Sequence, residues 1–378
     1  MITRTVYRED HEMFRATARR FVARECVPRQ AEWDEAGRVD RETWIKAGRE
    51  GLLCTSLSEE YGGGGGDFGH CAVLIEELAA ANVSGPGFSL HSDIIAPYIL
   101  RLGTEEQKRR WLPKCASGEC ILAIAMSEPG AGSDLKAVRT SAVLQGDEYV
   151  INGSKTFISN GLNCDLVVVV AKTDPAAGAK GVSLFLVEAD RPGFKKGLKL
   201  EKIGQHAADT AELFFDNVRI PATNLLGELN KGFIHLMQEL AQERFIIAVG
   251  AASTMEAMLA ETIRYTRERK LFGQSVFDFQ NSKFKLAELK TQAAAMRIMV
   301  DYYLGEHLRR KLTAEEAAIA KLFTTETLCA GLDDMLQLHG GYGYMTEYPI
   351  ARAYADARVT RIYGGTSEVM KELISRGL

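Results

Sequence analysis

Met126-Ser127-Glu128-Pro129-Gly130-Ala131-Gly132-Ser133-Asp134 is the stretch at which this 378-residue chain changes character. The residues before it have helical periodicity, whereas those after it alternate with a period of two and are rich in β-formers. Its glycines allow backbone N–H groups to come close to a ligand, and its hydroxyls can bond a polar edge. Taken alone, the stretch is equally compatible with a plain turn.

The regions on either side of this stretch predict three domains. Upstream of it, helices are expected at Tyr7–Val27, Arg41–Glu50, Asp67–Ala81, His91–Leu102 and Thr104–Ala116. Downstream, strands are expected at Tyr149–Asn152 and Lys155–Ile158 around a tight Gly153-Ser154 turn, then at Leu166–Ala171, Val182–Glu188 and Ala211–Val218. Long helices follow at 231–269, 279–311 and 313–338, with a final helix after Thr366. We therefore expect an α+β, mainly α, fold with an N-terminal helical domain (1–120), a middle β-domain (121–230) and a C-terminal helical bundle (231–378).

Composition excludes several function classes. The chain is 46% hydrophobic and 25% charged, with a net charge of −4 and no clustering of basic residues, so no nucleic-acid partner is expected. No apolar run approaches the roughly 20 residues that span a bilayer, so no membrane span is expected. The N-terminus leads directly into an amphipathic helix without an apolar signal segment, which predicts a cytoplasmic protein.

Cysteine spacing and short motifs also exclude several kinds of site. The seven cysteines show no paired short spacing, which predicts reduced thiols. The patterns His-x-x-x-His, Cys-x-x-Cys and Gly-x-Ser-x-Gly are absent, so we expect no metal site and no α/β-hydrolase chemistry. The run Gly64–Gly69 matches a dinucleotide fingerprint only as a string, because no buried strand precedes it. We interpret this run as a loop before the helix at Asp67–Ala81.

Glu243 and Arg244 lie in a helical stretch, 232–260, that otherwise has the pattern of a core helix. On a 3.6-residue period Glu243 shares a face with apolar residues: Leu236, Leu240, Ile246, Ile247 and Gly250. An ionised carboxylate on such a face is costly unless it is paired or used, so it is a candidate proton-transfer group. The alternative is a structural ion pair between Glu243 and an arginine from another helix.

A second loop, Ile362-Tyr363-Gly364-Gly365-Thr366-Ser367-Glu368, precedes the final helix, which Thr366 can cap. Together with other segments, these loops give the chain a resemblance to the acyl-CoA dehydrogenase family. The matching stretches are Leu102–Lys108, Met126–Asp134, Tyr149–Lys155, Arg267–Gly273, Gln337–Tyr344 and Gly364–Glu368. The resemblance implies a helical domain, a β-domain and a four-helix bundle. It further implies bound FAD, a homotetramer, an acyl-CoA substrate and electron-transfer flavoprotein as acceptor.

The resemblance assigns FAD contacts residue by residue. Along the flavin ring it places Ala125, Met126, Ser127 and Ser133 on one side and Phe157, Ile158 and Ser159 on the other. Across a subunit boundary it places Arg269, Phe272, Gln280, Gln337 and Gly341, and near the final helix it places Thr366 and Glu368. We assign substrate contacts to Ser133, Ile234, Arg244, Gly364 and Gly365.

One departure from the family pattern decides the predicted mechanism. Most members carry their catalytic glutamate directly before the Gly-Thr of the last turn, where this chain has Gly364. The long-chain and isovaleryl branches instead place the base at the position of Glu243. We therefore expect Glu243 to remove the α-proton of a saturated acyl-CoA while the β-hydrogen leaves as hydride to flavin N5. The product is a trans-2-enoyl-CoA, and the Gly364 N–H donates to the thioester carbonyl.

Several stretches resemble the long-chain branch most, among them Ser84–Ser92, Ala355–Val359 and Met370–Ile374. A medium- to long-chain substrate is the expectation, and a short branched acyl-CoA is the alternative. An acyl-CoA oxidase is a further alternative, although such enzymes usually carry an additional C-terminal region. The last alternative is a non-catalytic acyl-CoA-binding relative, against which Glu243 argues.

Overall fold

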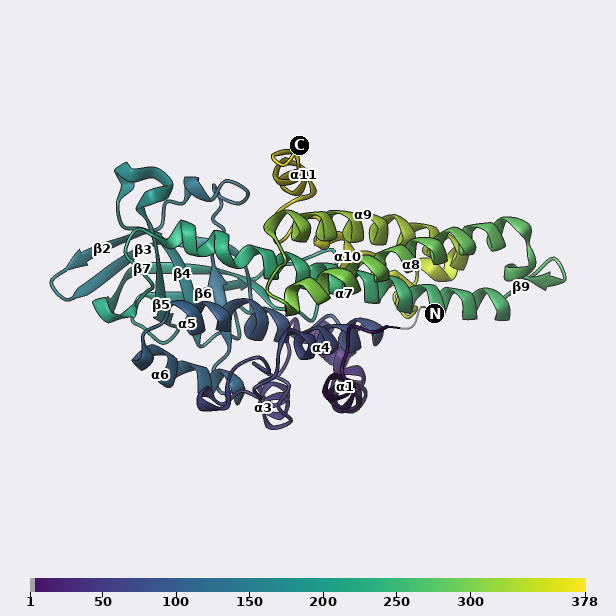
Figure 1. The fold of residues 1–378 in the computed structure, drawn as a ribbon, viewed down its shortest axis with the longest axis horizontal. Coiled ribbons are helices and arrows are strands. Elements are labelled where there is room, and N and C mark those ends of the chain that lie inside the picture. The colour runs from purple at the N-terminus through teal and green to yellow at the C-terminus, as the bar shows by residue number, and fades with distance from the viewer. Residues whose placement is uncertain (1–3) are drawn as a thin grey trace.

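The computed structural model describes residues 4–378, and it shows a helical domain, a β-domain and a helical bundle in chain order (Figure 1). The helical domain is formed by α1 (Glu9–Phe21), α2 (Gln30–Ala36), α3 (Arg41–Arg49), α4 (Phe68–Ala80), α5 (Ala96–Leu102) and α6 (Glu105–Ala116). Side-chain caps begin two of these helices where the sequence placed their ends: Asp67 accepts from Gly69 N, and Thr104 accepts from Gln107 N. The predicted fold class is confirmed.

Prolines modify the helices of this domain in ways that periodicity alone does not predict. The helix expected at His91–Leu102 begins as a π-helical turn, Leu90–Ile95, and becomes α-helical only at Ala96. Pro97, which lacks an N–H, stands at that junction. In the same way, α1 continues through a π turn and a 3₁₀ turn containing Pro28 before the unpredicted helix α2 begins.

The β-domain is built on one mixed sheet. Its strands are β1 (Leu122–Ala125), β2 (Ser141–Gln145), β3 (Glu148–Ser159), β4 (Leu166–Lys172), β5 (Val182–Glu188), β6 (Phe194–Lys199), β7 (Thr210–Pro221) and β8 (Leu225–Leu226). They follow the order β6-β7-β3-β2-β4-β5-β8, and β1 pairs in parallel with β4. Strand β4 is buried on both faces, because Val168 packs with α5 and α6 while Val167 and Val169 face the core of the β-domain.

The tight turn predicted at Gly153-Ser154 is wrong. Strand β3 includes both residues. The hairpin of β2 and β3 instead turns at Gly146, where φ is +68°. Gly153 sits at a β-bulge, since the pairing of β3 with β7 shifts register between Ile151 and Gly153. A Cβ at Gly153 would lie 2.4 Å from Thr140 Oγ1, so a glycine is needed for close approach rather than for a turn.

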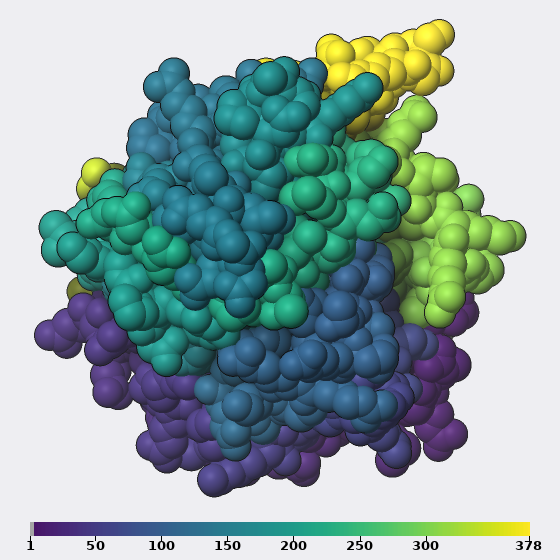
Figure 2. All heavy atoms as spheres, turned by 90° about the vertical axis from the view of Figure 1, so that its left-hand side faces the viewer, coloured from purple at the N-terminus to yellow at the C-terminus, as the bar shows by residue number. Residues whose placement is uncertain are grey.

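The C-terminal bundle is formed by α7 (Gly232–Glu268), α8 (Gln280–Leu308), α9 (Ala314–His339) and α10 (Pro349–Ala357), and α11 (Ser367–Ser375) follows it. A small hairpin, β9 (Lys270–Leu271) and β10 (Gln274–Ser275), joins α7 to α8. Helix α4 packs into the bundle core, so the first and third domains share one hydrophobic cluster. The hairpin and the β-domain lie at opposite ends of the molecule (Figure 1), and α11 projects from its surface (Figures 1 and 2).

Helix α7 is the longest element of the described chain, with 37 residues. By length and composition alone, this helix could cross a membrane, whereas the sequence predicted no membrane span. Within the protein, 56% of its most apolar 18-residue stretch is buried. The apolar stretch of 18 residues holds at most two charged residues, so it cannot include both Glu243 and Arg244, because Glu239 or Glu256 would then be a third. Among the described residues, all seven cysteines are free thiols, which confirms that prediction.

Candidate active site

Glu243 lies midway along α7 and is 7% exposed. Its carboxylate pairs with no arginine among residues 4–378. Instead, the fully buried Tyr98 of α5 donates from Oη to Oε1 over 2.8 Å. Burial raises the pKa of Glu243 to about 7, against the opposing effects of the Tyr98 hydroxyl and of Arg244. The alternative of a structural ion pair is therefore not what the structure contains.

The last turn, Gly364-Gly365, lies beside this part of α7. Arg244 Nε donates to the Gly364 carbonyl over 3.4 Å, and Lys321 Nζ of α9 donates to the Gly365 carbonyl over 2.7 Å. Both glycines have left-handed backbones, with φ of +65° and +98°. A Cβ placed on Gly364 would lie 2.6 Å from Ile247 Cδ1, one helical turn beyond Glu243. Two cations thus fix the carbonyls of this turn next to the carboxylate.

The stretch Met126–Asp134 is tied to the end of β3. The Thr156 N–H donates to the Ser127 carbonyl over 3.0 Å, and Lys155 Nζ donates to the Met126 carbonyl and to Glu128 Oε1 over 3.1 and 2.9 Å. The Lys155–Glu128 pair is buried, so it fixes the loop as well as satisfying both charges. The two segments assigned to opposite sides of a flavin ring are therefore neighbours in the fold.

Phe157 is held in a conformation that packing of the chain alone does not explain. Its backbone has φ of +60°, which is rare for a bulky side chain, and its ring is 71% exposed. An aromatic face held out in this way fits a planar ring of FAD. Ala125 and Ile158 are buried, so they can offer a ligand mainly their backbone, whereas Ser133 and Ser159 are exposed.

A second group of predicted FAD contacts lies at the other end of α7. Arg269, Gln337 and Gly341 line a cavity of about 620 Å³, and Phe272 next to it is 95% exposed. His339 also lines this cavity, and its Nε2 has no hydrogen-bond partner although it is buried. Arg269 and an unpartnered imidazole nitrogen fit the polar portion of a dinucleotide. Within one chain, this group is separated from Met126 and Phe157 by most of the length of the bundle.

The remaining predicted contacts are more dispersed. Ile234 is 50% exposed in the first turn of α7. Gln280 is exposed at the start of α8. Thr366 caps α11 by accepting from Val369 N over 3.3 Å, which confirms the predicted cap. Glu368 occupies the first turn of the same helix, and backbone N–H groups lower the pKa of its carboxyl.

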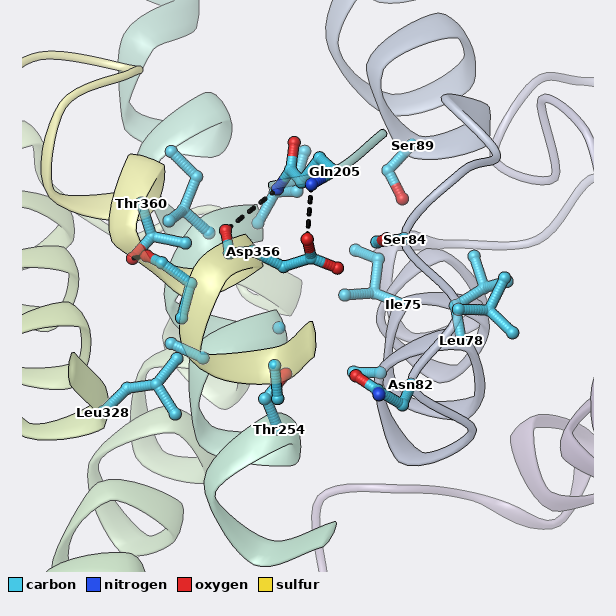
Figure 3. A pocket seen from close by; sticks show the side chains of 18 of the residues that line it. Ile75, Leu78, Asn82, Ser84, Ser89, Gln205, Thr254, Leu328, Asp356 and Thr360 are labelled. Carbon is cyan, nitrogen blue, oxygen red and sulfur yellow. Dashed lines mark hydrogen bonds between the residues drawn. The ribbon is translucent and has the colours of Figure 1, made fainter. Parts of the chain in front are cut away.

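A cavity of about 210 Å³ lies between α4, α7 and the segment around Asp356 (Figure 3). Ile247 and Gly250 of α7 line it, and they share a helical face with Glu243. Apolar side chains form its walls, from Ile75 and Leu78 of α4 to Ile246 and Ile247 of α7. Polar groups gather at one side, where the Gln205 side chain donates to the Asp356 carbonyl over 3.4 Å. The apolar face around Glu243 thus continues into a space that can hold a hydrocarbon chain.

One group of metal-type ligands occurs among residues 4–378: Asp10, His11 and His70. Both imidazoles already serve helix ends, because Nδ1 of His11 accepts from Arg8 N and Nδ1 of His70 accepts from Asp67 N. Their Nε2 atoms consequently carry the hydrogen, and that of His11 bonds Asp67 over 2.8 Å. We interpret the group as a capping cluster for α1 and α4.

Sequence reasoning missed Tyr98 and Lys321. Lys321 is 1% exposed on an otherwise small and apolar face of α9, and burial lowers its pKa to about 8. The criterion that singled out Glu243, a charge on an apolar helical face, also finds Lys321. Tyr98 carries no such signal, because a tyrosine fits a core helix as well as a site.

Three family models match the chain, namely the N-terminal, middle and C-terminal domains of acyl-CoA dehydrogenase at residues 8–119, 123–218 and 230–378. The chain belongs to the acyl-CoA dehydrogenase family. The long-chain specific acyl-CoA dehydrogenase of Sus scrofa mitochondria is 52% identical over 99% of this chain and 87% of its own length. The isovaleryl-CoA dehydrogenase of Pongo abelii is 36% identical over 97% of this chain and 88% of its own.

Solved structures agree with this assignment. An acyl-CoA dehydrogenase from Geobacillus kaustophilus superposes with a TM-score of 0.97 at 48% identity and covers 99% of each chain. A chain from the structure described as electron transferring flavoprotein of Acidaminococcus fermentans gives 0.94 at 37%, over 98% of each chain. A glutaryl-CoA dehydrogenase from Mycobacterium smegmatis in complex with FADH2 gives 0.92 at 30%, covering 98% of this chain and 95% of its own. This acyl-CoA dehydrogenase is an FAD-dependent oxidoreductase, as the resemblance implied.

The buried carboxyl of Glu243 makes stability depend on pH. Its folded pKa of about 7 lies above the ordinary value of 4.5, so the folded protein keeps a proton that the unfolded chain releases between these values. Stability is therefore lost as pH rises through this window, by about 3 kcal/mol at 1.36 kcal/mol per pKa unit. Glu243→Gln should raise the unfolding temperature of the FAD-bound protein at pH 8 and much less at pH 5. An equal gain at both pH values would contradict a raised pKa.

Proposed function

We propose that this acyl-CoA dehydrogenase oxidises medium- to long-chain saturated acyl-CoA thioesters to trans-2-enoyl-CoA, with Glu243 as the base that removes the α-proton. The observation that carries the proposal is a desolvated carboxylate, with a pKa near neutral pH, next to a last turn that has glycine in place of the usual glutamate. A base works best when its pKa lies near the operating pH, because it is then both ionised and able to hold a proton.

In the proposed mechanism, the acyl chain lies along α7 with its α-carbon at Glu243. The Gly364 N–H donates to the thioester oxygen, which gains charge as the α-proton leaves. Arg244 and Lys321 hold the carbonyls of Gly364 and Gly365, so the backbone of this turn is fixed before the substrate arrives. Met126 and Phe157 would hold FAD, which would supply the hydride acceptor for the β-hydrogen. The proton stays on Glu243 until product leaves.

The cavity lined by Ile247 and Gly250, on the face of α7 that Glu243 shares, supports a longer acyl chain. Gly250 lies two turns further along α7, about 10 Å from Glu243 at 1.5 Å per residue, and still lines this cavity. A short branched acyl group would end before this point and leave apolar walls unfilled, whereas a longer chain would bury them. We therefore favour a medium- to long-chain substrate over the isovaleryl alternative.

We also propose a homotetramer in which one subunit completes the FAD site of another. Arg269 follows the end of α7, about 40 Å along the helix axis from Glu243. One FAD molecule cannot contact Arg269 and the Met126 loop of the same subunit across that distance. A second subunit that supplies Arg269, Phe272 and Gln337 resolves this, and it would cover the exposed Phe272 ring.

Electron-transfer flavoprotein is the acceptor that we propose, supported by the family resemblance and by the similarity to a chain in a structure described by that protein's name. Direct transfer to oxygen, as in an oxidase, is the alternative. Hydrogen peroxide formed in air without any added acceptor would favour the oxidase.

The base assignment predicts the behaviour of Glu243→Gln. The amide keeps shape and polarity but cannot take a proton, so dye-linked turnover of the best acyl-CoA should fall by about 10²–10⁴-fold with FAD still bound. Glu256→Gln, which changes another carboxylate of α7 that pairs with Arg297, serves as the control and should retain turnover. Near-normal turnover of Glu243→Gln would contradict the assignment.

Relocating the carboxylate extends the same test. Glu243→Gly combined with Gly364→Glu rebuilds the arrangement of the more common branches, but the new Cβ meets Ile247 Cδ1 and a left-handed backbone. Adding Ile247→Val removes that carbon. Turnover should exceed that of Glu243→Gly alone, and should be higher with Ile247→Val than without it. Recovery should stay partial, because a small misplacement costs about 100-fold.

The cavity assignment predicts a change in specificity. Gly250→Leu should fill the cavity two turns from Glu243 and move the best substrate toward shorter acyl chains. Gly250→Ala is the control, because its Cβ meets only Ile75 Cγ2 at an ordinary 3.6 Å. The measurement is kcat/KM for acyl-CoAs of increasing length. An equal loss for all lengths would show that the chain does not enter this cavity.

The subunit assignment predicts that FAD retention depends on Phe272. Phe272→Ser should reduce the flavin content of the purified protein. It should also reduce the molar mass of the assembly, measured by light scattering. Leu198→Ser alters an apolar side chain of β6 that is 82% exposed, and it should leave both unchanged. A wild-type protein that is monomeric with full FAD content would contradict the proposal.

A further inference from the structure

Two side-chain contacts connect α5 of the first domain to the catalytic part of α7. Tyr98 Oη donates to Glu243 Oε1 over 2.8 Å, and Arg101 Nη1 donates to Glu239 Oε2 over 2.6 Å. The two residues of α5 are three apart and the two of α7 are four apart, so each pair lies on one face of its helix. The contacts therefore form two parallel cross-links between the helices, one helical turn apart.

The two cross-links differ in environment. Arg101 is half exposed and reaches Glu239 from the surface, whereas Tyr98 is completely buried. Among residues 4–378, the Tyr98 hydroxyl has no other hydrogen-bond partner, so it is directed only at Glu243. No donor among residues 4–378 bonds the second oxygen, Oε2. One oxygen of the carboxylate is thus held and the other is left for a proton.

We propose that Tyr98 is a positioning residue for Glu243: its hydroxyl fixes Oε1 and thereby orients Oε2 toward the α-carbon of the acyl-CoA. This inference rests on the proposed role of Glu243 as base. A carboxylate on a glutamate has three rotatable bonds, and a single fixed oxygen removes most of that freedom before substrate binds. No charged donor bonds this carboxylate among residues 4–378. An arginine at the same place would keep Glu243 ionised and make it a weaker base.

The same hydrogen bond affects the proton affinity of Glu243. The groups that face the carboxylate are Tyr98 from α5, which lowers the pKa, and Glu239 and Arg244 from α7, which raise and lower it. Arg101 pairs with Glu239 and offsets its charge. On the neighbouring helices, Lys321 of α9 bonds the last turn, and His307 of α8 bonds Gln242 with a pKa lowered to about 4, so it is neutral near pH 7.

Tyr98→Phe tests the inference in the FAD-bound enzyme. It removes only the hydroxyl, so Glu243 loses a hydrogen bond to its charged form and its pKa must rise. The acidic limb of kcat/KM against pH should move up by about one pH unit, which is the size expected for a bond to a charged group. The kcat plateau at high pH should also fall by about 3- to 10-fold while KM changes little, because the carboxylate is less well oriented.

Tyr61→Phe is the matched control. It breaks another tyrosine–glutamate bond of the same domain, a partly exposed one from Tyr61 Oη to Glu105 Oε2 over 2.9 Å, and should shift neither the acidic limb nor the kcat plateau. Arg101→Gln is a second test that leaves the buried core intact: it exposes Glu243 to the charge of Glu239 and should also move the acidic limb upward. An acidic limb that stays in place in Tyr98→Phe overturns the inference, whatever Arg101→Gln shows.

Infrared titration separates this inference from the assignment of the base. The carboxyl band that is present in the wild type and missing in Glu243→Gln reports the protonation of Glu243 whether or not it is catalytic. Its midpoint should be higher in Tyr98→Phe than in the wild type. An unshifted midpoint would overturn the role of Tyr98 alone, whereas full turnover in Glu243→Gln would overturn the proposed function.

Discussion

One constraint governs the structure: the Glu243 carboxylate is buried with a neutral hydrogen-bond donor and, among residues 4–378, without a paired cation. Such a group can be kept inside a protein only when the surrounding elements are held firmly, because water would otherwise solvate it. The first domain supplies this restraint through α5, and the last turn closes the site from the opposite side. The raised pKa that makes Glu243 costly for stability is also what makes it an effective base near neutral pH.

Helix α7 carries this constraint through the molecule. Its first turns lie against the β-domain, its middle holds Glu243 and the cavity wall, and its end leads to the hairpin beside Arg269. Because the helix is continuous, these sites are set at fixed distances of 1.5 Å per residue. Because α7 is rigid, the predicted FAD contacts near Met126 and those near Arg269 are too far apart in one chain to bind the same FAD molecule. The length of α7 therefore supports a cofactor site shared between subunits.

The long periodic elements could be predicted from the sequence, and the local exceptions could not. The helices at 231–269, 279–311 and 313–338 lie within a few residues of α7, α8 and α9, because long runs of good helix formers without an interior proline leave few alternatives. Gly153 was misread as a turn because a glycine between β-formers has the same local appearance in a turn and in a bulge; only its approach to Thr140 decides. Glu243 can be identified from the sequence because it is a charged residue on an otherwise apolar helical face. Tyr98 cannot, because a tyrosine is common in a core helix. A residue that acts through a contact 145 positions away leaves no local pattern in the sequence.

The position of the base also explains the chemistry of the last turn. With glycine at 364, the turn carries no side chain, and its left-handed backbone brings the peptide close to Ile247 without a clash. Its two carbonyls are then free to accept from Arg244 and Lys321, which fixes the peptide planes that carry the N–H groups of Gly365 and Thr366. A glutamate at the same place would have to displace Ile247 and would put a second carboxylate beside Glu243, where like charges disfavour ionisation of both. The two positions for the base are therefore mutually exclusive, and the choice of α7 leaves the last turn to act through its backbone alone.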